Sequence, residues 1–164
     1  RGEIKAIGFG INDTGLIPRF LERFDPDMFL VAMPYTLMDQ DALDEELPLC
    51  AEKGVSAVIG SVFSSGITAT GGGSDAVYGY KPPPADVLTK LNGIEAVCAR
   101  HGVPMRAAAL QFPLFHPVVA SIIPGAMAPE HVMENAALME HAIPSDFWAE
   151  LKSERLMHPD APTG

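Results

Sequence analysis

Apolar residues in this chain recur alternately at the spacing of a strand and at the spacing of a helix. The short apolar runs typical of strands are residues 4–10, 28–33, 55–59 and 119–123. The helical patterns that follow them are residues 16–24, 43–53, 85–101, 106–115, 129–141 and 144–154. Because strands that alternate with helices pair in parallel through crossover connections, this order predicts an α/β fold built on one parallel sheet.

Two architectures satisfy this order: an open doubly wound sheet, and one half of an eight-stranded (β/α)8 barrel. The 164 residues suffice for one domain, which we expect to span residues 1–164, and the 48% hydrophobic composition is ample for a core. A whole barrel typically needs about 250 residues. The chain begins at Arg1 without an initiator Met and enters a strand almost at once. The pattern therefore favours the second half of a longer barrel.

The charge balance excludes some classes of partner. A net charge of −10 with only 11 Lys and Arg residues argues against nucleic acid, because neutralising phosphates needs clustered basic side chains. No stretch approaches the ~20 consecutive apolar residues of a membrane span, and the N-terminus lacks the layout of a secretion signal. We therefore expect a cytoplasmic protein with no membrane partner. Cys50 and Cys98 are far apart and are predicted to be reduced thiols.

Several kinds of catalytic or metal site find no support in the sequence. The five histidines include no pair four residues apart, which is the spacing that places two metal ligands on one helix face. We therefore expect no metal site. A Gly-x-Ser-x-Gly elbow and a Walker-type phosphate loop are also absent from the sequence. Hydrolase and nucleoside triphosphatase chemistry are accordingly not indicated.

The stretch "IIPGAMAPEHVMEN", residues 122–135, ends a strand in Pro-Gly and begins a helix at Pro129. The N-cap position is Ala128, which has no side-chain oxygen to accept a hydrogen bond from the first-turn amides. A helix that begins in this way can bind a phosphate at its free amides. The alternative interpretation is an ordinary turn whose amides are satisfied by water.

Several segments, in this order and spacing, carry a resemblance to a known family. They are "IKAIGFGIN" at 4–12, "PYTLMDQDALDEELPLC" at 34–50, "SSGI" at 64–67, "HGVPMRAAALQFPLFHP" at 101–117, "IIPGAMAPEHVMEN" at 122–135 and "DAPT" at 160–163. The chain resembles the C-terminal half of the aldo/keto reductase superfamily, in particular its bacterial branch of sugar and pyridoxal dehydrogenases. The resemblance implies a (β/α)8 TIM barrel to which this chain contributes the fifth to eighth strands.

The resemblance also implies that the barrel binds NAD or NADP across the carboxyl ends of its strands. The loop after the seventh strand would pack over the pyrophosphate, and here it comprises Phe63, Ser64, Ser65, Gly66 and Ile67. The loop and helix after the eighth strand would hold the adenosine end, through Pro124, Gly125, Ala126, His131, Glu134 and Asn135. Asn12, after the fifth strand, is the remaining candidate, as a ligand of the nicotinamide amide.

Departures from the family pattern bear on the choice of cofactor. Members that prefer NADP have a Lys and a Ser where this chain has Gly125 and Ala126, and an Arg where it has His131. Because a 2′-phosphate is normally bound by Arg or Lys, their absence favours NAD over NADP. The Gln and Tyr that often contact the nicotinamide are replaced by Ala32 and Gly60, so the nicotinamide contacts differ from the usual ones.

The family's catalytic Asp, Tyr, Lys and His lie in the first half of the barrel, and no residue of this chain matches them. Tyr35, Tyr78 and Tyr80 are interpreted as packing or loop residues. The resemblance implies an NAD(P)-dependent oxidoreductase acting on a sugar, aldehyde or alcohol, with this half inactive alone. The alternative is a catalytically inactive half-barrel that acts as a nucleotide-binding or assembly module.

The expected partners are a small carbonyl or sugar substrate and a structure that completes the sheet. A half-barrel exposes two strand edges, at residues 4–10 and 119–123, and bare edges invite pairing. We expect either the missing N-terminal half-barrel or a second copy of the chain to cover them.

Overall fold

The computed structural model describes residues 2–164 and contains one four-stranded sheet. The strands are β1 (Gly8–Ile11), β2 (Met28–Ala32), β3 (Ser56–Gly60) and β4 (Val119–Ile123), in that spatial order. All three neighbouring pairs are parallel. The predicted parallel α/β sheet is therefore confirmed. Strands that follow one another in the sequence are also neighbours in the sheet.

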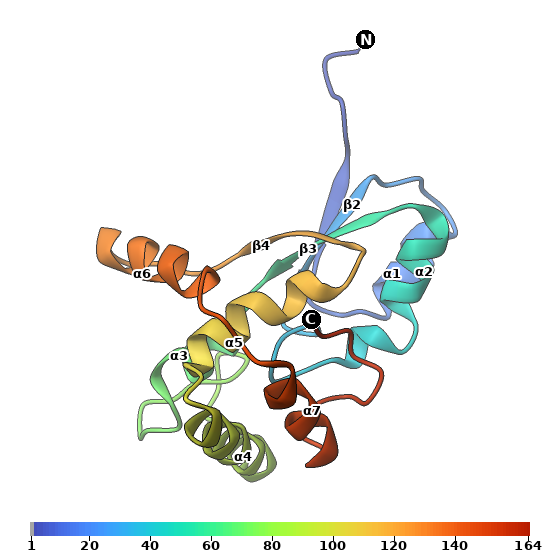
Figure 1. Ribbon diagram of the computed structural model, residues 1–164. Coiled ribbons are helices and arrows are strands. Elements are labelled where there is room, and N and C mark those ends of the chain that lie inside the picture. The colour runs from blue at the N-terminus through green and yellow to red at the C-terminus, as the bar shows by residue number, and fades with distance from the viewer. Residues whose placement is uncertain (1) are drawn as a thin grey trace.

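In the described part of the chain, seven α-helices connect and cover the strands (Figure 1). They are α1 (Leu16–Leu21), α2 (Glu46–Lys53), α3 (Ile67–Thr70), α4 (Ala85–His101), α5 (Met105–Gln111), α6 (Pro129–Met139) and α7 (Ser145–Ser153). Short 3-10 turns lie at Asp41–Leu43, Ser64–Gly66 and Phe112–Phe115. The bounds predicted for α4 and β4 are confirmed, and most other helices are shorter than predicted by a few residues at their ends.

The first strand begins later than the predicted 4–10 run. Among the described residues, 2–7 pair with no strand, because β2 begins only at Met28, the partner of Gly8. The backbone of Ile7 instead pairs with Asp27: the Ile7 amide donates to the Asp27 carboxylate at 2.7 Å, and the Asp27 amide donates to the Ile7 carbonyl at 2.8 Å. The start of the strand is thus set by the length of its partner rather than by its own apolar residues.

Helices cover one face of the sheet. Phe29, Val31, Ala57 and Ile59 point to that face and are fully buried, as the alternation of side chains along a strand requires. In Figure 1, α4, α5 and α7 lie together on this side. Trp148 of α7 packs against Phe112, Phe115 and Phe147, with ring centroids 4.9–6.3 Å apart, and joins the C-terminal part of the chain to this core.

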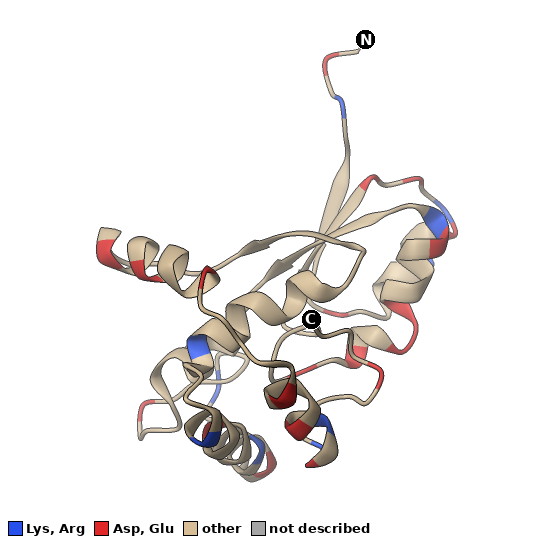
Figure 2. Cartoon of the chain, in the orientation of Figure 1, with Lys and Arg blue, Asp and Glu red and all other residues tan. Residues whose placement is uncertain are grey.

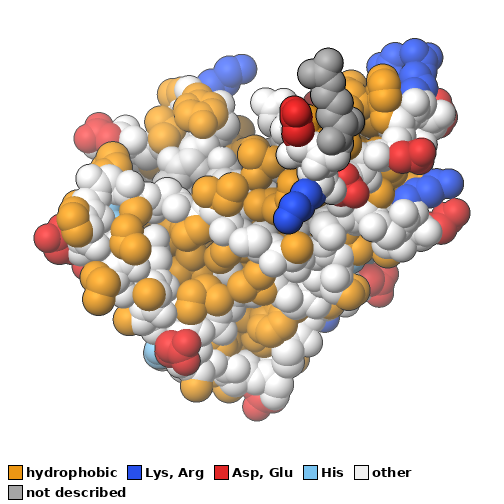
Figure 3. Space-filling model, turned by 90° about the horizontal axis from the view of Figure 1, so that it is seen from above, with side chains coloured by type: hydrophobic (Ala, Val, Ile, Leu, Met, Phe, Trp, Pro, Cys, Tyr) orange, Lys and Arg blue, Asp and Glu red, His pale blue; other side chains and the backbone are white. Residues whose placement is uncertain are grey.

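The opposite face of the sheet has no such cover. Met28, Leu30 and Ile123 alternate with the buried residues and are partly or largely exposed, Ile123 by 54%. Figure 3, which views the molecule from above, shows hydrophobic side chains gathered across this side. We call it the inner face; it consists of the side chains that point away from the helices, chiefly Met28, Leu30, Val58 and Ile123.

Charged side chains are spread over the helices and loops. Figure 2 shows Lys and Arg as scattered segments, interleaved with the more numerous Asp and Glu. Among the described residues, every helix is too short or too polar to cross a membrane.

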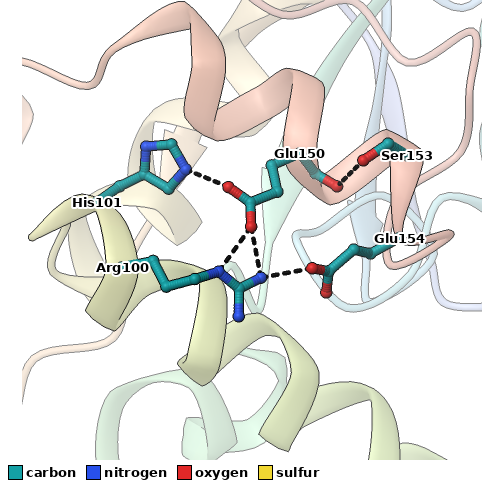
Figure 4. Close-up of polar contacts among 5 residues, drawn as sticks. All are labelled: Arg100, His101, Glu150, Ser153 and Glu154. Atoms are coloured by element: carbon teal, nitrogen blue, oxygen red, sulfur yellow. Dashed lines mark hydrogen bonds and ion pairs between the residues drawn. The ribbon is translucent and has the colours of Figure 1, made fainter.

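An ion-pair cluster fastens α7 to the end of α4 (Figure 4). Glu150 accepts a hydrogen bond from Arg100 Nε at 2.6 Å and contacts the His101 ring, while Glu154 accepts from Arg100 Nη2 at 2.5 Å, the nitrogen that Glu150 also contacts. The hydrogen bonds from His101 and Arg100 lower the pKa of the Glu150 carboxyl. The folded state therefore favours the ionised form of Glu150.

This shift predicts how stability depends on pH. A carboxyl with a lowered folded-state pKa adds stability that is present above its ordinary pKa and is lost as the pH falls through the folded-state value. We expect Glu150→Gln to lower the midpoint of urea unfolding near neutral pH and to match the unsubstituted chain in acid. Glu154→Gln, which leaves both Glu150 contacts in place, is the control with the smaller effect. A Glu150→Gln deficit of equal size at all pH values would contradict this assignment.

Candidate functional site

A cavity of about 440 Å³ lies where β3 and β4 end side by side. Its walls come from the loop that follows β3, the segment that follows β4, and one side chain of α5. The lining residues are Ser61, Phe63, Ser65, Gly66, Ala69, Thr70, Arg106, Ile123, Gly125, Met127 and His131. In parallel α/β folds, ligands bind at this carboxyl edge of the sheet, because the loops that can form a pocket all leave the strands there.

The loop after β3 adopts an unusual backbone. Ser61, Ser64 and Ser65 have positive φ angles of 55°, 49° and 63°, and Gly66 follows at 99°. Residues other than glycine seldom adopt this left-handed region, and each costs on the order of 1 kcal/mol or more. Such strain persists only where surrounding contacts hold it, and it is common at ligand-binding loops.

Side-chain hydrogen bonds of Ser64 and Ser65 help to hold the strained loop. The hydroxyls of Ser64 and Thr36 lie 3.0 Å apart in a fully buried contact, and either can donate. The Gly79 amide donates to the Ser65 hydroxyl at 3.0 Å. The Ser64 side chain is thus turned into the protein, whereas Ser65 and Gly66 line the cavity.

The segment after β4 leads into α6 without a side-chain cap. Ala128 is the N-cap residue in an extended conformation, and Pro129 occupies the first helical position. The Met127 amide donates to His131 Nδ1 at 3.3 Å. Through Nδ1, His131 thus satisfies an amide of the loop before the helix. The first amides of α6 itself receive no side-chain acceptor among the described residues.

Arg106 brings a positive charge to the cavity from α5. Its Nη1 donates to Glu134 at 2.9 Å, its Nη2 donates to Asn135 Oδ1 at 2.9 Å, and its guanidinium carbon lies 5.7 Å from the centre of the Phe63 ring. Its Nε is buried and has no hydrogen-bond partner among the described residues. Among the described residues that line the cavity, Arg106 is the single Lys or Arg.

Asn135 forms hydrogen bonds with residues from two other parts of the site. It is only 6% exposed, accepts from Arg106, and donates from Nδ2 to the Gly125 carbonyl over a long 3.5 Å. One buried amide therefore joins α5, α6 and the loop after β4.

The residues predicted for the cofactor fall into three groups. Those in the cavity wall are Phe63, Ser65, Gly66, Gly125 and His131. Those beside an adjoining cavity of about 270 Å³ are Pro124, Ala126 and Asn135. Those outside both are Asn12, Ser64, Ile67 and Glu134. Asn12 is an exposed residue just past β1, Ile67 is fully buried in the core, and Glu134 reaches the site only through Arg106.

Sequence reasoning missed Arg106 and Ser61. A signal for Arg106 was present, since a long cationic side chain precedes four residues, Ala107 to Leu110, that are all fully buried. A cation at the edge of an apolar helix face needs a partner elsewhere in the fold. Ser61 gave no such signal, because the feature that distinguishes it in the cavity wall is its left-handed backbone conformation.

A larger polar cavity of about 770 Å³ lies elsewhere, between the loop around Asp39 and helices α4 and α7, and contains none of the predicted residues. Burial and the nearby charge of Asp39 raise the pKa of Tyr78 to about 12, while burial lowers the pKa of Lys90. Asp44 pairs with His158 at 3.3 Å. This cavity is therefore not the site that the sequence indicated.

Comparison with known proteins bears on the family and the fold of the chain. The model of the aldo/keto reductase family matches residues 1–155. A pyridoxal 4-dehydrogenase from Microbacterium luteolum is 40% identical over 95% of this chain and 46% of its own length. A D-threo-aldose 1-dehydrogenase from a Pseudomonas species is 39% identical over 95% of this chain and 48% of its own length. The chain thus spans about half the length of these curated relatives.

A solved structure gives the same proportion. The holo form of an aldo-keto reductase from Bacillus halodurans superimposes with a TM-score of 0.70 at 22% identity, over 89% of this chain and 48% of the other. The four parallel strands and their helices therefore have the fold of half a (β/α)8 barrel, as the sequence resemblance implied.

The buried position of Asn135 predicts its contribution to stability. Asn135→Ala leaves a terminal nitrogen of Arg106 without its acceptor, and an unsatisfied buried donor costs about 1–3 kcal/mol. We expect the free energy of unfolding, measured in urea, to fall by that amount. Asn92→Ala, at an exposed position of α4, is the matched control and should change it by less than about 0.5 kcal/mol. Equal effects of the two substitutions would show that the buried contacts contribute nothing.

Proposed function

Because the chain belongs to the aldo/keto reductase family, we propose that it forms part of an NAD(P)-dependent oxidoreductase acting on a sugar, an aldehyde or an alcohol. Within that enzyme, this chain binds the pyrophosphate and the adenosine end of the cofactor. The cavity at the carboxyl ends of β3 and β4 is the observation that carries the proposal. The names of the two curated relatives, a pyridoxal and an aldose dehydrogenase, support the substrate class.

The residues around the cavity fit such a cofactor. The Ser65 hydroxyl and the backbone at Gly66 stand in the wall, and a Cβ placed at Gly66 would meet nothing within 4 Å, so a phosphate has room to approach the backbone. The first turn of α6 reaches the cavity wall at His131 and has no side-chain cap. When bound, the cofactor would supply or accept the hydride. The protein groups described here would hold and orient it.

The charges around the adenosine end favour NAD. A 2′-phosphate carries about two negative charges near neutral pH, and it is normally bound by free Arg or Lys side chains. Gly125 and Ala126 offer only backbone groups, and His131 Nδ1 accepts from the Met127 amide. Arg106 is a cation at this cavity, but Glu134 already pairs with it.

The catalytic groups of the proposed enzyme lie outside this chain. Tyr35 is fully buried between Phe112 and His116, and Tyr80 is 88% exposed on the loop before α4. Tyr78 lines the other cavity. None of these tyrosines lines the cavity proposed for the cofactor. The gene sequence upstream of Arg1, or the intact mass of the protein, decides between an enzyme and an inactive module.

The inner face supports the proposal that a second half completes the barrel. Met28, Leu30 and Ile123 would be buried there by four further strands, with the edges β1 and β4 paired on either side. The relatives are about twice as long as this chain, so a half of matching size exists in the family. Without it, a second copy is the occupant of the same face.

Cofactor preference is the direct test of this function. We expect the full-length gene product to bind and use NAD in preference to NADP. Gly125→Lys with His131→Arg should shift the ratio of kcat/KM toward NADP by about ten- to a hundredfold, since each charge-assisted contact contributes on that scale. A Cβ at Gly125 would meet nothing within 4 Å, so the Lys fits without a clash. A higher kcat/KM with NADP in the unsubstituted enzyme would refute this assignment.

The exposed inner face leads to a second prediction, which concerns the oligomeric state of the chain. The 164-residue chain produced by itself should dimerise through its edges and inner face, and light scattering at micromolar concentration measures this. Leu30→Lys, which places a charge on the inner face, should yield monomers. Val132→Lys replaces an exposed apolar residue of α6 and should leave the dimer intact. A monomeric unsubstituted chain would rule out this mode of association.

A further inference from the structure

Arg106 and Glu134 form an ion pair at the rim of the cavity. The pair joins α5 to α6 at 2.9 Å, with the Arg106 side chain 29% exposed and the Glu134 side chain 54% exposed. The arginine is thus largely enclosed, whereas its carboxylate partner stands mostly in water. Because Glu134 is half exposed, its charge can be removed by substitution without creating a new buried charge at position 134.

The guanidinium is held at two points that act differently. Glu134 neutralises its charge through Nη1, whereas Asn135 fixes its position through Nη2 and is itself buried. The Phe63 ring packs near the guanidinium at 5.7 Å. Removing the Glu134 charge would therefore leave the guanidinium at the cavity wall, still oriented by Asn135 and Phe63.

An unpaired guanidinium at this position would be a strong phosphate ligand. Its planar donors match phosphate geometry, and a charge-assisted hydrogen bond to phosphate is about twice as strong as a neutral one. With Glu134 in place, the guanidinium is neutralised, and the carboxylate itself would repel a second phosphate on the ribose. The cation and its acidic partner together present little net charge to a ligand.

We infer that Glu134 is a specificity-determining residue, which disfavours a 2′-phosphorylated adenosine by masking the Arg106 guanidinium at the cavity wall. This inference rests on the proposed function, because it concerns how the same cavity distinguishes NAD from NADP. Arg106 is a latent phosphate ligand, and the chain needs only a change at Glu134 to expose it. Asn135 is the positioning residue that keeps the guanidinium in reach.

The test measures the dissociation constants of NAD⁺ and NADP⁺ by titration calorimetry on the full-length gene product. Glu134→Gln removes the charge and keeps an amide oxygen that can accept from Nη1. It should tighten NADP⁺ binding by about tenfold and change NAD⁺ binding by less than about threefold. The NADP⁺ gain should shrink as salt is added, since it depends on charge.

Two further variants separate release of Arg106 from simple loss of repulsion. Glu134→Gln with Arg106→Met should lose the NADP⁺ gain, because the gain depends on the guanidinium. If that double variant does not fold, Glu134→Gln with Arg106→Gln replaces it, because a Gln side chain keeps an amide donor for Asn135 but carries no charge. Glu130→Gln, at an exposed carboxylate in the first turn of the same helix, is the matched control and should tighten NADP⁺ binding by less than about threefold.

The outcomes distinguish the two levels of the proposal. A gain in NADP⁺ affinity that survives removal of Arg106, or no gain in Glu134→Gln, overturns the masking role while NAD⁺ binding by the unsubstituted protein still supports the proposed function. Failure of the folded, unsubstituted protein to bind either dinucleotide overturns the proposed function and the inference together.

Discussion

Parallel pairing of β3 with β4 is the interaction on which the cavity depends. Gly60 lies beside Ile123 at the end of the ladder, so the chain leaves both strands at the same edge of the sheet. The crossover between them passes through α4 and α5 on the covered face, and α5 begins near that edge, so that Arg106 in its first turn reaches the cavity. Three segments far apart in the sequence therefore meet at one site because two strands point the same way.

The loop after β3 shows how tertiary contacts sustain an unfavourable backbone. Its left-handed serines cost free energy. The buried Ser64–Thr36 contact and the burial of Ile67 offset part of that cost. At the end of β2, Met33 is also left-handed, with φ 85°, and its sulfur accepts from the Ser65 hydroxyl at 3.8 Å. The two neighbouring loops thus hold each other, and the conformation of Ser65 and Gly66 is fixed before any ligand arrives.

The sequence predicted regular elements well where their ends carry local signals. The bounds of α4 are clear because Pro84 precedes it and Gly102, with φ 64°, ends it in the left-handed conformation. The site was predicted less completely, because side-chain directions within a loop have no simple period. Five consecutive loop residues were grouped as one binding element, yet Ser64 and Ile67 turn into the core. Arg106 depends on contacts 28 and 29 residues away, and its local pattern indicates that it needs a partner without indicating which one.

The inner face and the cavity meet at one layer of side chains. Ala32, Gly60 and Ile123 are neighbours across β2, β3 and β4 at the carboxyl edge, and Ile123 also lines the cavity. Below them the layer of Leu30 and Val58 is larger. Small residues at Ala32 and Gly60 therefore leave the face open next to the cavity, where a ligand extending from it can lie against the sheet. A structure that covered the inner face as proposed would pack against its deeper layer, and its fit beside Ala32 and Gly60 would then help to determine the shape of the site.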